Sequence, residues 1–144
     1  MSGTSLPPVI GAADPLAPLF AVGTSASVVA RHRLPDAEGP ERDVHPHEYR
    51  VEVTVERSRL NERGMVCDLD VLRAAVRTVL DRIEGRELDA VVPAEAGHAV
   101  TVEVLARFIH DALSEPIRLA GGDGLSVRIW ESPTEFGAYR ARVS

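Results

Sequence analysis

The stretch that decides the fold is His45-Pro46-His47-Glu48-Tyr49-Arg50-Val51-Glu52-Val53-Thr54-Val55-Glu56. From Tyr49 onward apolar and polar residues alternate, which is typical of a β-strand with one buried face. Because side chains alternate between the faces of a strand, His45 and His47 share a face. The preceding stretch from Leu19 to Leu34 is rich in Val, Ser, Thr and Ala and predicts another strand, with His32 near its end. We expect the two strands to form a hairpin that gathers the three histidines at its loop end.

Three imidazoles on one face are a candidate metal site. Neutral histidine nitrogens are common zinc ligands, and a set of three leaves a fourth tetrahedral position open, as in catalytic zinc sites. We therefore predict that His32, His45 and His47 bind Zn²⁺, which would polarise a bound substrate oxygen. The alternative is three polar histidines at strand ends near a loop, and an isolated H-x-H pair would favour it.

Two helices are predicted after the hairpin, one from an N-cap at Asp68 to about Glu84 and one from an N-cap at Thr101 to about Ser114. Each carries an apolar stripe with the three- and four-residue spacing of a helix. Pro116 is expected to stop the second helix, because proline lacks the backbone N–H that a helix interior needs.

Two further strands are predicted, from Leu125 to Glu131 and from Gly137 to Val143. The order ββααββ favours an α+β domain, with a four-stranded antiparallel sheet and two helices on one face. Residues 1–17 are rich in Pro, Gly, Ala and Ser and are interpreted as a flexible leader, so a single domain would span 18–144. The uncovered sheet face and edges predict a homo-oligomer.

Composition narrows the function classes. The net charge of −6 argues against a nucleic acid or an anionic membrane as partner. Cys67 is the single cysteine, so no intrachain disulfide can form and a reducing compartment suits the chain. The sequence has no signal-peptide pattern and no apolar run of the ~20 residues that a membrane span needs, so we expect a cytoplasmic protein.

The sequence resembles the 6-pyruvoyl-tetrahydropterin synthase family, which includes the 6-carboxy-tetrahydropterin synthases. The landmarks follow the family order, and they are Ala30-Arg31-His32-Arg33-Leu34, His45-Pro46-His47-Glu48-Tyr49, Gly64-Met65-Val66-Cys67-Asp68-Leu69, Thr101-Val102-Glu103-Val104-Leu105-Ala106 and Trp130-Glu131-Ser132-Pro133-Thr134. The resemblance implies the ββααββ tunnelling fold (T-fold), with subunits joined into an oligomeric barrel as a trimer or hexamer. It also implies a pterin-like substrate, which Glu131 would bind through the guanidine-like edge of the ring with help from Thr101. For Glu131 the alternative is a structural salt bridge.

The chain departs from the family pattern at its acid–base residues. The family cysteine, four residues before the first histidine of H-x-H, is replaced by Glu41, and the family's Asp-His pair is replaced by Glu84 and Gly85. Glu41 is a candidate general base, as in the family members that carry Glu there and give a 6-hydroxymethyl product; the alternative is an exposed loop acid. Glu84 is a second catalytic candidate. His98 is a third, which would replace the missing histidine from another direction unless it is a surface loop histidine.

Three functions remain open from the sequence. The first is a zinc-dependent lyase of this family that acts on dihydroneopterin triphosphate or a relative, with Glu41 in place of the cysteine. The second is the same zinc scaffold with another small carbonyl or hydroxyl substrate in specialised metabolism. The third is a non-catalytic protein that binds a pterin or purine.

Overall fold

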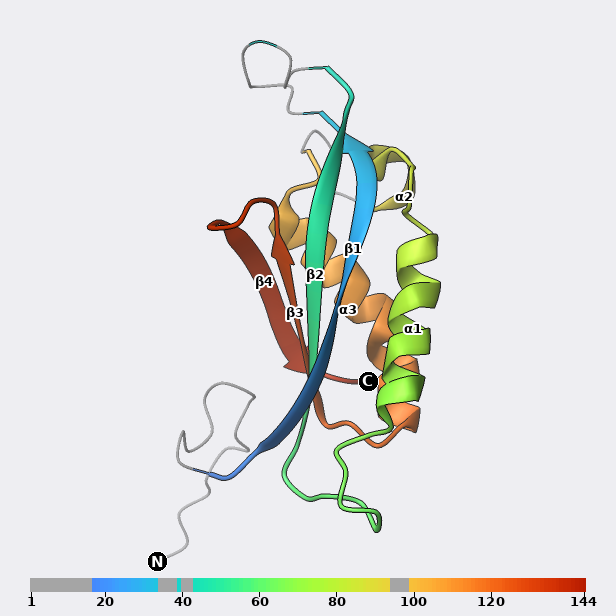
Figure 1. Cartoon of the computed structure of the whole chain (residues 1–144), viewed down its shortest axis with the longest axis vertical. Helices are drawn as coiled ribbons and strands as arrows, with labels where there is room; N and C mark the ends of the chain where they lie inside the picture. The colour runs from blue at the N-terminus through green and yellow to red at the C-terminus, as the bar shows by residue number, and fades with distance from the viewer. Residues whose placement is uncertain (1–16, 34–38, 40–42, 94–98) are drawn as a thin grey trace, which may run out of the picture.

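The computed structural model describes residues 17–33, 39, 43–93 and 99–144. Most of the predicted leader, as well as Glu41 and His98, lie outside these residues. The elements follow the order β1 (Phe20–His32), β2 (His45–Arg57), α1 (Leu69–Asp81), α2 (Leu88–Val91), α3 (Val102–Leu119), β3 (Gly124–Trp130) and β4 (Phe136–Arg142). The predicted α+β class is therefore confirmed, with the short α2 as an addition that the sequence analysis did not predict (Figure 1).

The four strands form one antiparallel sheet in the order β1-β2-β3-β4. The hairpin of β1 and β2 is its longest pair, and His32 lies directly across from His45 in the register. Three residues of β2, Val51, Val53 and Val55, are fully buried on one face. This is the alternation that the sequence predicted for β2.

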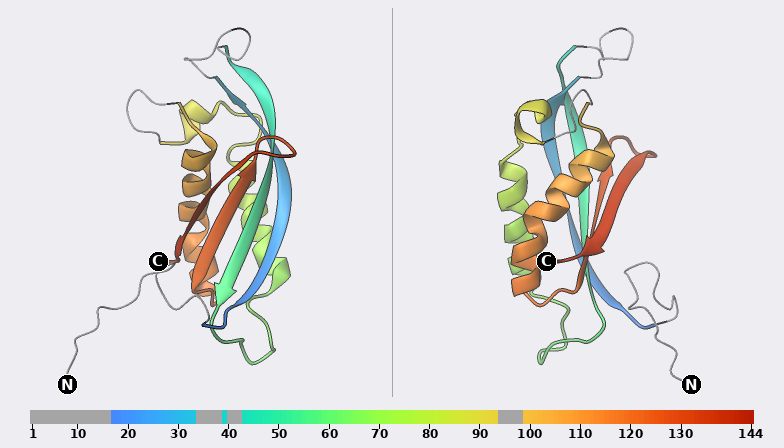
Figure 2. Two further views of the ribbon diagram at one scale, coloured as in Figure 1. Left: turned by 90° about the vertical axis from the view of Figure 1, so that its left-hand side faces the viewer. Right: turned by 180° about the vertical axis from the view of Figure 1, so that it is seen from behind.

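Helices α1 and α3 cover the same face of the sheet (Figure 2). Side chains from the two helices and the inner rows of the strands make one apolar core, which includes Leu72, Leu105, Ile109, Leu125 and Ile129, all of them fully buried. Burying this apolar surface is the main favourable term in the folding of such a layer pair. No helix in the described ranges is long and apolar enough to cross a membrane.

The predicted helices differ from the observed ones at their carboxyl ends. Helix α1 starts after the predicted cap, where the Asp68 carboxylate accepts a hydrogen bond from the Asp70 amide at 2.8 Å, but it ends at Asp81 rather than near Glu84. The chain then turns tightly and reaches Gly85, whose φ of 71° lies in the left-handed region that favours glycine.

Pro116 does not stop α3, so that expectation was wrong: the helix runs to Leu119. A proline in the last turn removes only its own N–H from the helix ladder. Ile117 is fully buried in the core, and Ala120 donates its N–H to the carbonyl of Pro116 at 3.0 Å. Packing and this remaining hydrogen bond keep the final turn helical.

The segment after α1 lies along the free edge of β1. The amide of Gly85 donates to the carbonyl of Val29 at 2.7 Å, and the amide of Arg31 donates to the carbonyl of Arg86 at 2.8 Å. A short parallel bridge joins Arg31 to Glu87. The end of β1 that carries His32 is therefore held on both sides, by β2 and by this segment.

Truncation of the core should destabilise the protein far more than truncation of the same helix on its exposed side. We expect Ile109→Ala to lower the free energy of unfolding by about 2–5 kcal/mol, because it leaves a cavity in the core. The matched control is Leu119→Ala, also in α3, where the side chain is 70% exposed. Urea denaturation measures both, and equal losses would contradict the described packing.

Candidate metal centre

Three histidines meet where β1 ends and β2 begins. His32 is the last residue of β1, and His45 and His47 are the first and third residues of β2. All three lie on the face of the sheet that carries the core, because His32 pairs with His45 and Ala30 pairs with His47. In Figure 1 these strand ends lie at the top of the molecule, beside α2. The structure therefore gathers the predicted ligands at the hairpin's loop end.

The distances between the rings suit a shared cation. The centroid of the His32 ring lies 4.5 Å from that of His45 and 5.2 Å from that of His47. One nitrogen from each ring can be chosen so that all three nitrogens lie within 4.8 Å of one another. Zn–N bonds are about 2.1 Å long, so two nitrogen ligands of a tetrahedral zinc lie about 3.4 Å apart. Small ring rotations would close that difference, so the donor set fits a zinc ion.

Backbone carbonyls fix the tautomers of the two β2 histidines. His45 places Nδ1 2.9 Å from the carbonyl oxygen of Asp43, and His47 places Nε2 2.8 Å from the carbonyl oxygen of Glu131. A carbonyl only accepts, so each of these nitrogens carries a proton and donates it. The lone pairs then lie on Nε2 of His45 and Nδ1 of His47. Hydrogen bonds of this kind orient metal-binding histidines in general.

His32 is 8% exposed, and its Nδ1 lies 3.3 Å from the hydroxyl of Tyr49. The Tyr49 side chain is 1% exposed and lies below the three histidines on the same face. Burial raises the pKa of Tyr49 well above its usual range, and the negative charge of Glu131 raises it further. Tyr49 is therefore a neutral phenol at the pH of a cell.

Glu131 follows the last residue of β3 and is exposed. Its backbone carbonyl contacts His47, and its carboxylate is close enough to Tyr49 to affect the pKa of that phenol. For Glu131 a structural salt bridge was the alternative to ligand binding, and no salt bridge of Glu131 is found among the described residues. The exposed carboxylate is instead open to solvent at the edge of the histidine cluster, where a ligand could reach it.

The other predicted site residues have structural contacts or lie outside the described ranges. The Thr101 hydroxyl caps α3 by accepting a hydrogen bond from the Val104 amide at 3.2 Å, and its own proton remains available to a ligand. Glu84 uses its carboxylate to accept from the Val29 amide at 3.0 Å. Catalytic roles for Glu84, Glu41 and His98 stay predictions.

Sequence reasoning missed the partners of the histidines. Tyr49 has the same parity along β2 as His45 and His47, so an H-x-H-x-Y pattern was the available signal. The carbonyls of Asp43 and Glu131 had no signal, because backbone atoms are the same at every position. The Glu131 carbonyl comes near His47 only once β3 pairs with β2.

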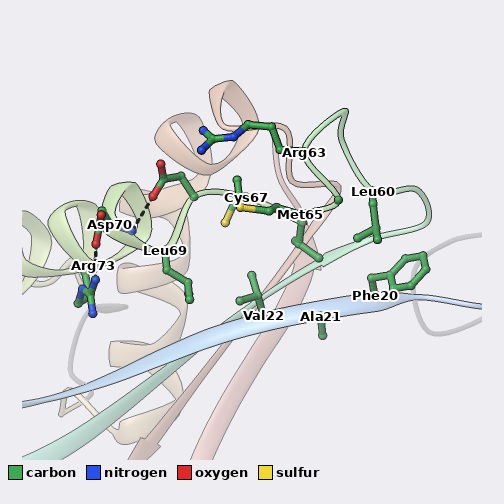
Figure 3. A pocket seen from close by; sticks show the side chains of 13 residues that line it. Phe20, Ala21, Val22, Leu60, Arg63, Met65, Cys67, Leu69, Asp70 and Arg73 are labelled. Carbon is green, nitrogen blue, oxygen red and sulfur yellow. Dashed lines mark hydrogen bonds and ion pairs between the residues drawn. The ribbon is translucent and has the colours of Figure 1, made fainter.

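A separate hollow lies at the opposite end of β1, with a volume of about 660 Å³ (Figure 3). Phe20, Val22 and Met65 contribute to its apolar lining. Cys67 also lines it but is only 3% exposed, and burial raises the pKa of its thiol. Cys67 is thus a small buried residue at the other end of β1 from the histidines.

Comparison with known proteins gives one family and one fold. The family model for 6-pyruvoyl tetrahydropterin synthase matches residues 22–142. Among solved structures, 6-pyruvoyl tetrahydropterin synthase from Caenorhabditis elegans is 25% identical with a TM-score of 0.64, over 86% of this chain and 96% of that one. The Plasmodium vivax enzyme is 13% identical with a TM-score of 0.66, over 88% of this chain and 99% of that one. A form of it in which a catalytic glutamate is replaced by cysteine has a TM-score of 0.68 at 12% identity, with the same coverage. No curated protein matches the chain by sequence.

Removal of one histidine should abolish zinc binding. We expect the purified protein to bind about one zinc ion per chain and to melt at a higher temperature with zinc, because a ligand of the native state stabilises it. His45→Ala should lose both effects, since two imidazoles hold zinc far more weakly than three.

The matched control for this prediction is Glu48→Gln. Glu48 lies between His47 and Tyr49 in the sequence, so its side chain points to the other face of the sheet. Metal analysis and thermal denaturation with and without zinc measure the outcome. Zinc binding that survives in His45→Ala, or that fails equally in Glu48→Gln, would contradict the assigned ligand set.

Proposed function

Because the chain belongs to the 6-pyruvoyl tetrahydropterin synthase family, we propose that it is a zinc-dependent lyase that acts on a pterin-type substrate, dihydroneopterin triphosphate or a relative. The observation that carries the proposal is the cluster of His32, His45 and His47, whose donor nitrogens lie within 4.8 Å of one another. When bound there, zinc would act as a Lewis acid toward side-chain oxygens of the substrate.

The protein residues around the cluster have distinct tasks in this proposal. His45 and His47 donate to carbonyls, and this leaves the lone pair of the other nitrogen of each ring available to the metal. The exposed carboxylate of Glu131 anchors the heterocycle, because a carboxylate accepts two parallel hydrogen bonds from a guanidine-like edge. Thr101, at the start of α3, donates its hydroxyl proton to the same ring. Both residues lie in segments that resemble landmarks of the family.

Proton transfer falls to Glu41 in this proposal. The Plasmodium vivax enzyme has a catalytic glutamate, as its cysteine and alanine variants document. Glu41 lies four residues before His45, at the position where the resemblance places the family nucleophile. A carboxylate can serve as general base when its surroundings bring its pKa toward the working pH. The product would then be a 6-hydroxymethyl pterin, as in the family members that carry glutamate at this position.

We also propose that the chain works as a homo-oligomer, a trimer or hexamer, in the cytoplasm. Within the described residues β1 and β4 are the two edge strands, and β1 is covered by residues 84–87 only near its end. Edge strands with unpaired backbone groups favour pairing with another chain. The single cysteine suits a reducing compartment.

A second candidate keeps the zinc site but changes the reaction. The carboxylate of Glu84 is engaged by the Val29 amide, and Gly85 has no side chain, at the positions where the family has its Asp-His pair. This observation favours either another small carbonyl or hydroxyl substrate or a pterin-binding protein without catalysis. Product analysis separates these from the lyase.

Glu131 gives a test of ligand binding that does not depend on turnover. We expect Glu131→Gln to weaken binding of a pterin such as neopterin by roughly 10–100-fold, because a hydrogen bond to a charged group contributes about 1.5–3 kcal/mol. The matched control is Glu135→Gln, in the same turn, where the carboxylate accepts hydrogen bonds from the Ser132 and Thr134 hydroxyls. Fluorescence titration measures the affinities, and an unchanged affinity in Glu131→Gln would rule out this anchor.

Incubation of the zinc-loaded protein with dihydroneopterin triphosphate tests the reaction itself. We expect a pterin product with a shortened side chain, and a rate that falls roughly 10²–10⁴-fold in Glu41→Gln while the zinc content stays unchanged. Chromatography with mass detection identifies the product. Absence of turnover in the loaded wild-type protein would remove this substrate, and full activity in Glu41→Gln would remove the general base.

A further inference from the structure

Tyr49 contacts two of the three proposed zinc ligands. Its hydroxyl lies 3.3 Å from Nδ1 of His32, and the centroid of its ring lies 4.7 Å from that of His47. The sheet register explains how it reaches them. Tyr49 pairs with Val28, which lies four residues before His32 on β1. The phenol therefore extends along the sheet surface toward the histidines, beyond the Val28 with which Tyr49 pairs.

A small residue on the neighbouring strand makes room for this reach. Ala30 is the residue between Val28 and His32 on the inner face of β1, and it pairs with His47. Its side chain is a single methyl group and is fully buried. A larger side chain at this position would occupy the path of the phenol toward His32.

The hydroxyl of Tyr49 is itself buried with the rest of the side chain, which is 1% exposed. A buried hydroxyl without a hydrogen bond costs free energy, so the contact with His32 gives the phenol oxygen a hydrogen-bond partner at a buried position. The ring contacts and the hydrogen bond together fix the position of Tyr49. A side chain that is fixed in this way can hold the imidazole next to it in one orientation.

We propose that Tyr49 is a positioning residue for the metal: its phenol oxygen accepts the Nδ1 proton of His32 and thereby directs the Nε2 lone pair of that ring to the cation. His45 and His47 have backbone carbonyls in the same role. The partner of His32 is a side chain, so this one interaction can be removed by substitution. The inference rests on the zinc site of the proposed function.

Zinc affinity of Tyr49→Phe is the direct test. The variant keeps the ring and its packing and removes only the oxygen. We expect its zinc affinity, measured by competition with a colorimetric chelator, to fall roughly 10–100-fold, as for other partners of metal-binding histidines. We also expect the visible absorption bands of the cobalt-substituted variant to shift, since they report the ligand geometry. A merely structural tyrosine would leave both unchanged.

The second tyrosine of the chain provides the matched control. Tyr139 in β4 packs edge-on against His110, with 4.9 Å between ring centroids, and His110 is not part of the proposed ligand set. Tyr139→Phe should bind zinc as the wild type does. If Tyr49→Phe and Tyr139→Phe both keep wild-type affinity, the inference is wrong while the zinc site stands. If the wild-type protein itself binds no zinc, the zinc site of the proposed function is wrong, and the inference about Tyr49 is wrong with it.

A measurement on the wild-type protein covers the case in which Tyr49→Phe does not fold. Long-range proton–nitrogen correlation spectra distinguish the two nitrogens of each histidine in the zinc-loaded protein. We expect His32 to carry its proton on Nδ1 and to bind zinc through Nε2. Binding of zinc through Nδ1 of His32 would overturn the inference, because that nitrogen could not then donate to Tyr49.

Discussion

The pairing of β1 with β2 is the constraint on which the rest of the structure depends. The register places His32 across from His45 and continues without interruption to Phe20 and Arg57. Since side chains alternate between faces, a slip of one residue in β2 would move its histidines and its buried valines to the opposite face together. The same hydrophobic pattern that fixes the core therefore also fixes the metal site.

The site is a continuation of the core rather than an addition to its surface. Along the inner face of β2 the fully buried valines give way to Tyr49 and then to the two half-buried histidines. The apolar rows hold the strands rigidly, and residues 84–87 hold the other edge of β1 beside His32. A metal site needs its ligands within a few tenths of an ångström of their working positions, and a sheet supplies that precision better than a loop does.

The sequence predicted the parts of this arrangement that follow from periodicity. Alternation predicted β2 and the shared face of its histidines, and the apolar stripes predicted α1 and α3. It could not give the reach of Tyr49 to His32, because that depends on the register and on Ala30 across the hairpin. The carbonyl partner of His47 required the pairing of β2 with β3. The extension of α3 past Pro116 reflects the burial of Ile117, which outweighs a local preference.

The central claim is that His32, His45 and His47 bind one divalent cation. Anomalous diffraction at the zinc absorption edge, from crystals of the full chain grown with zinc, tests it most directly. The account predicts a single strong peak about 2.0–2.1 Å from one nitrogen of each of the three rings. If crystals grown with excess zinc show no anomalous peak among the three rings, the claim is contradicted.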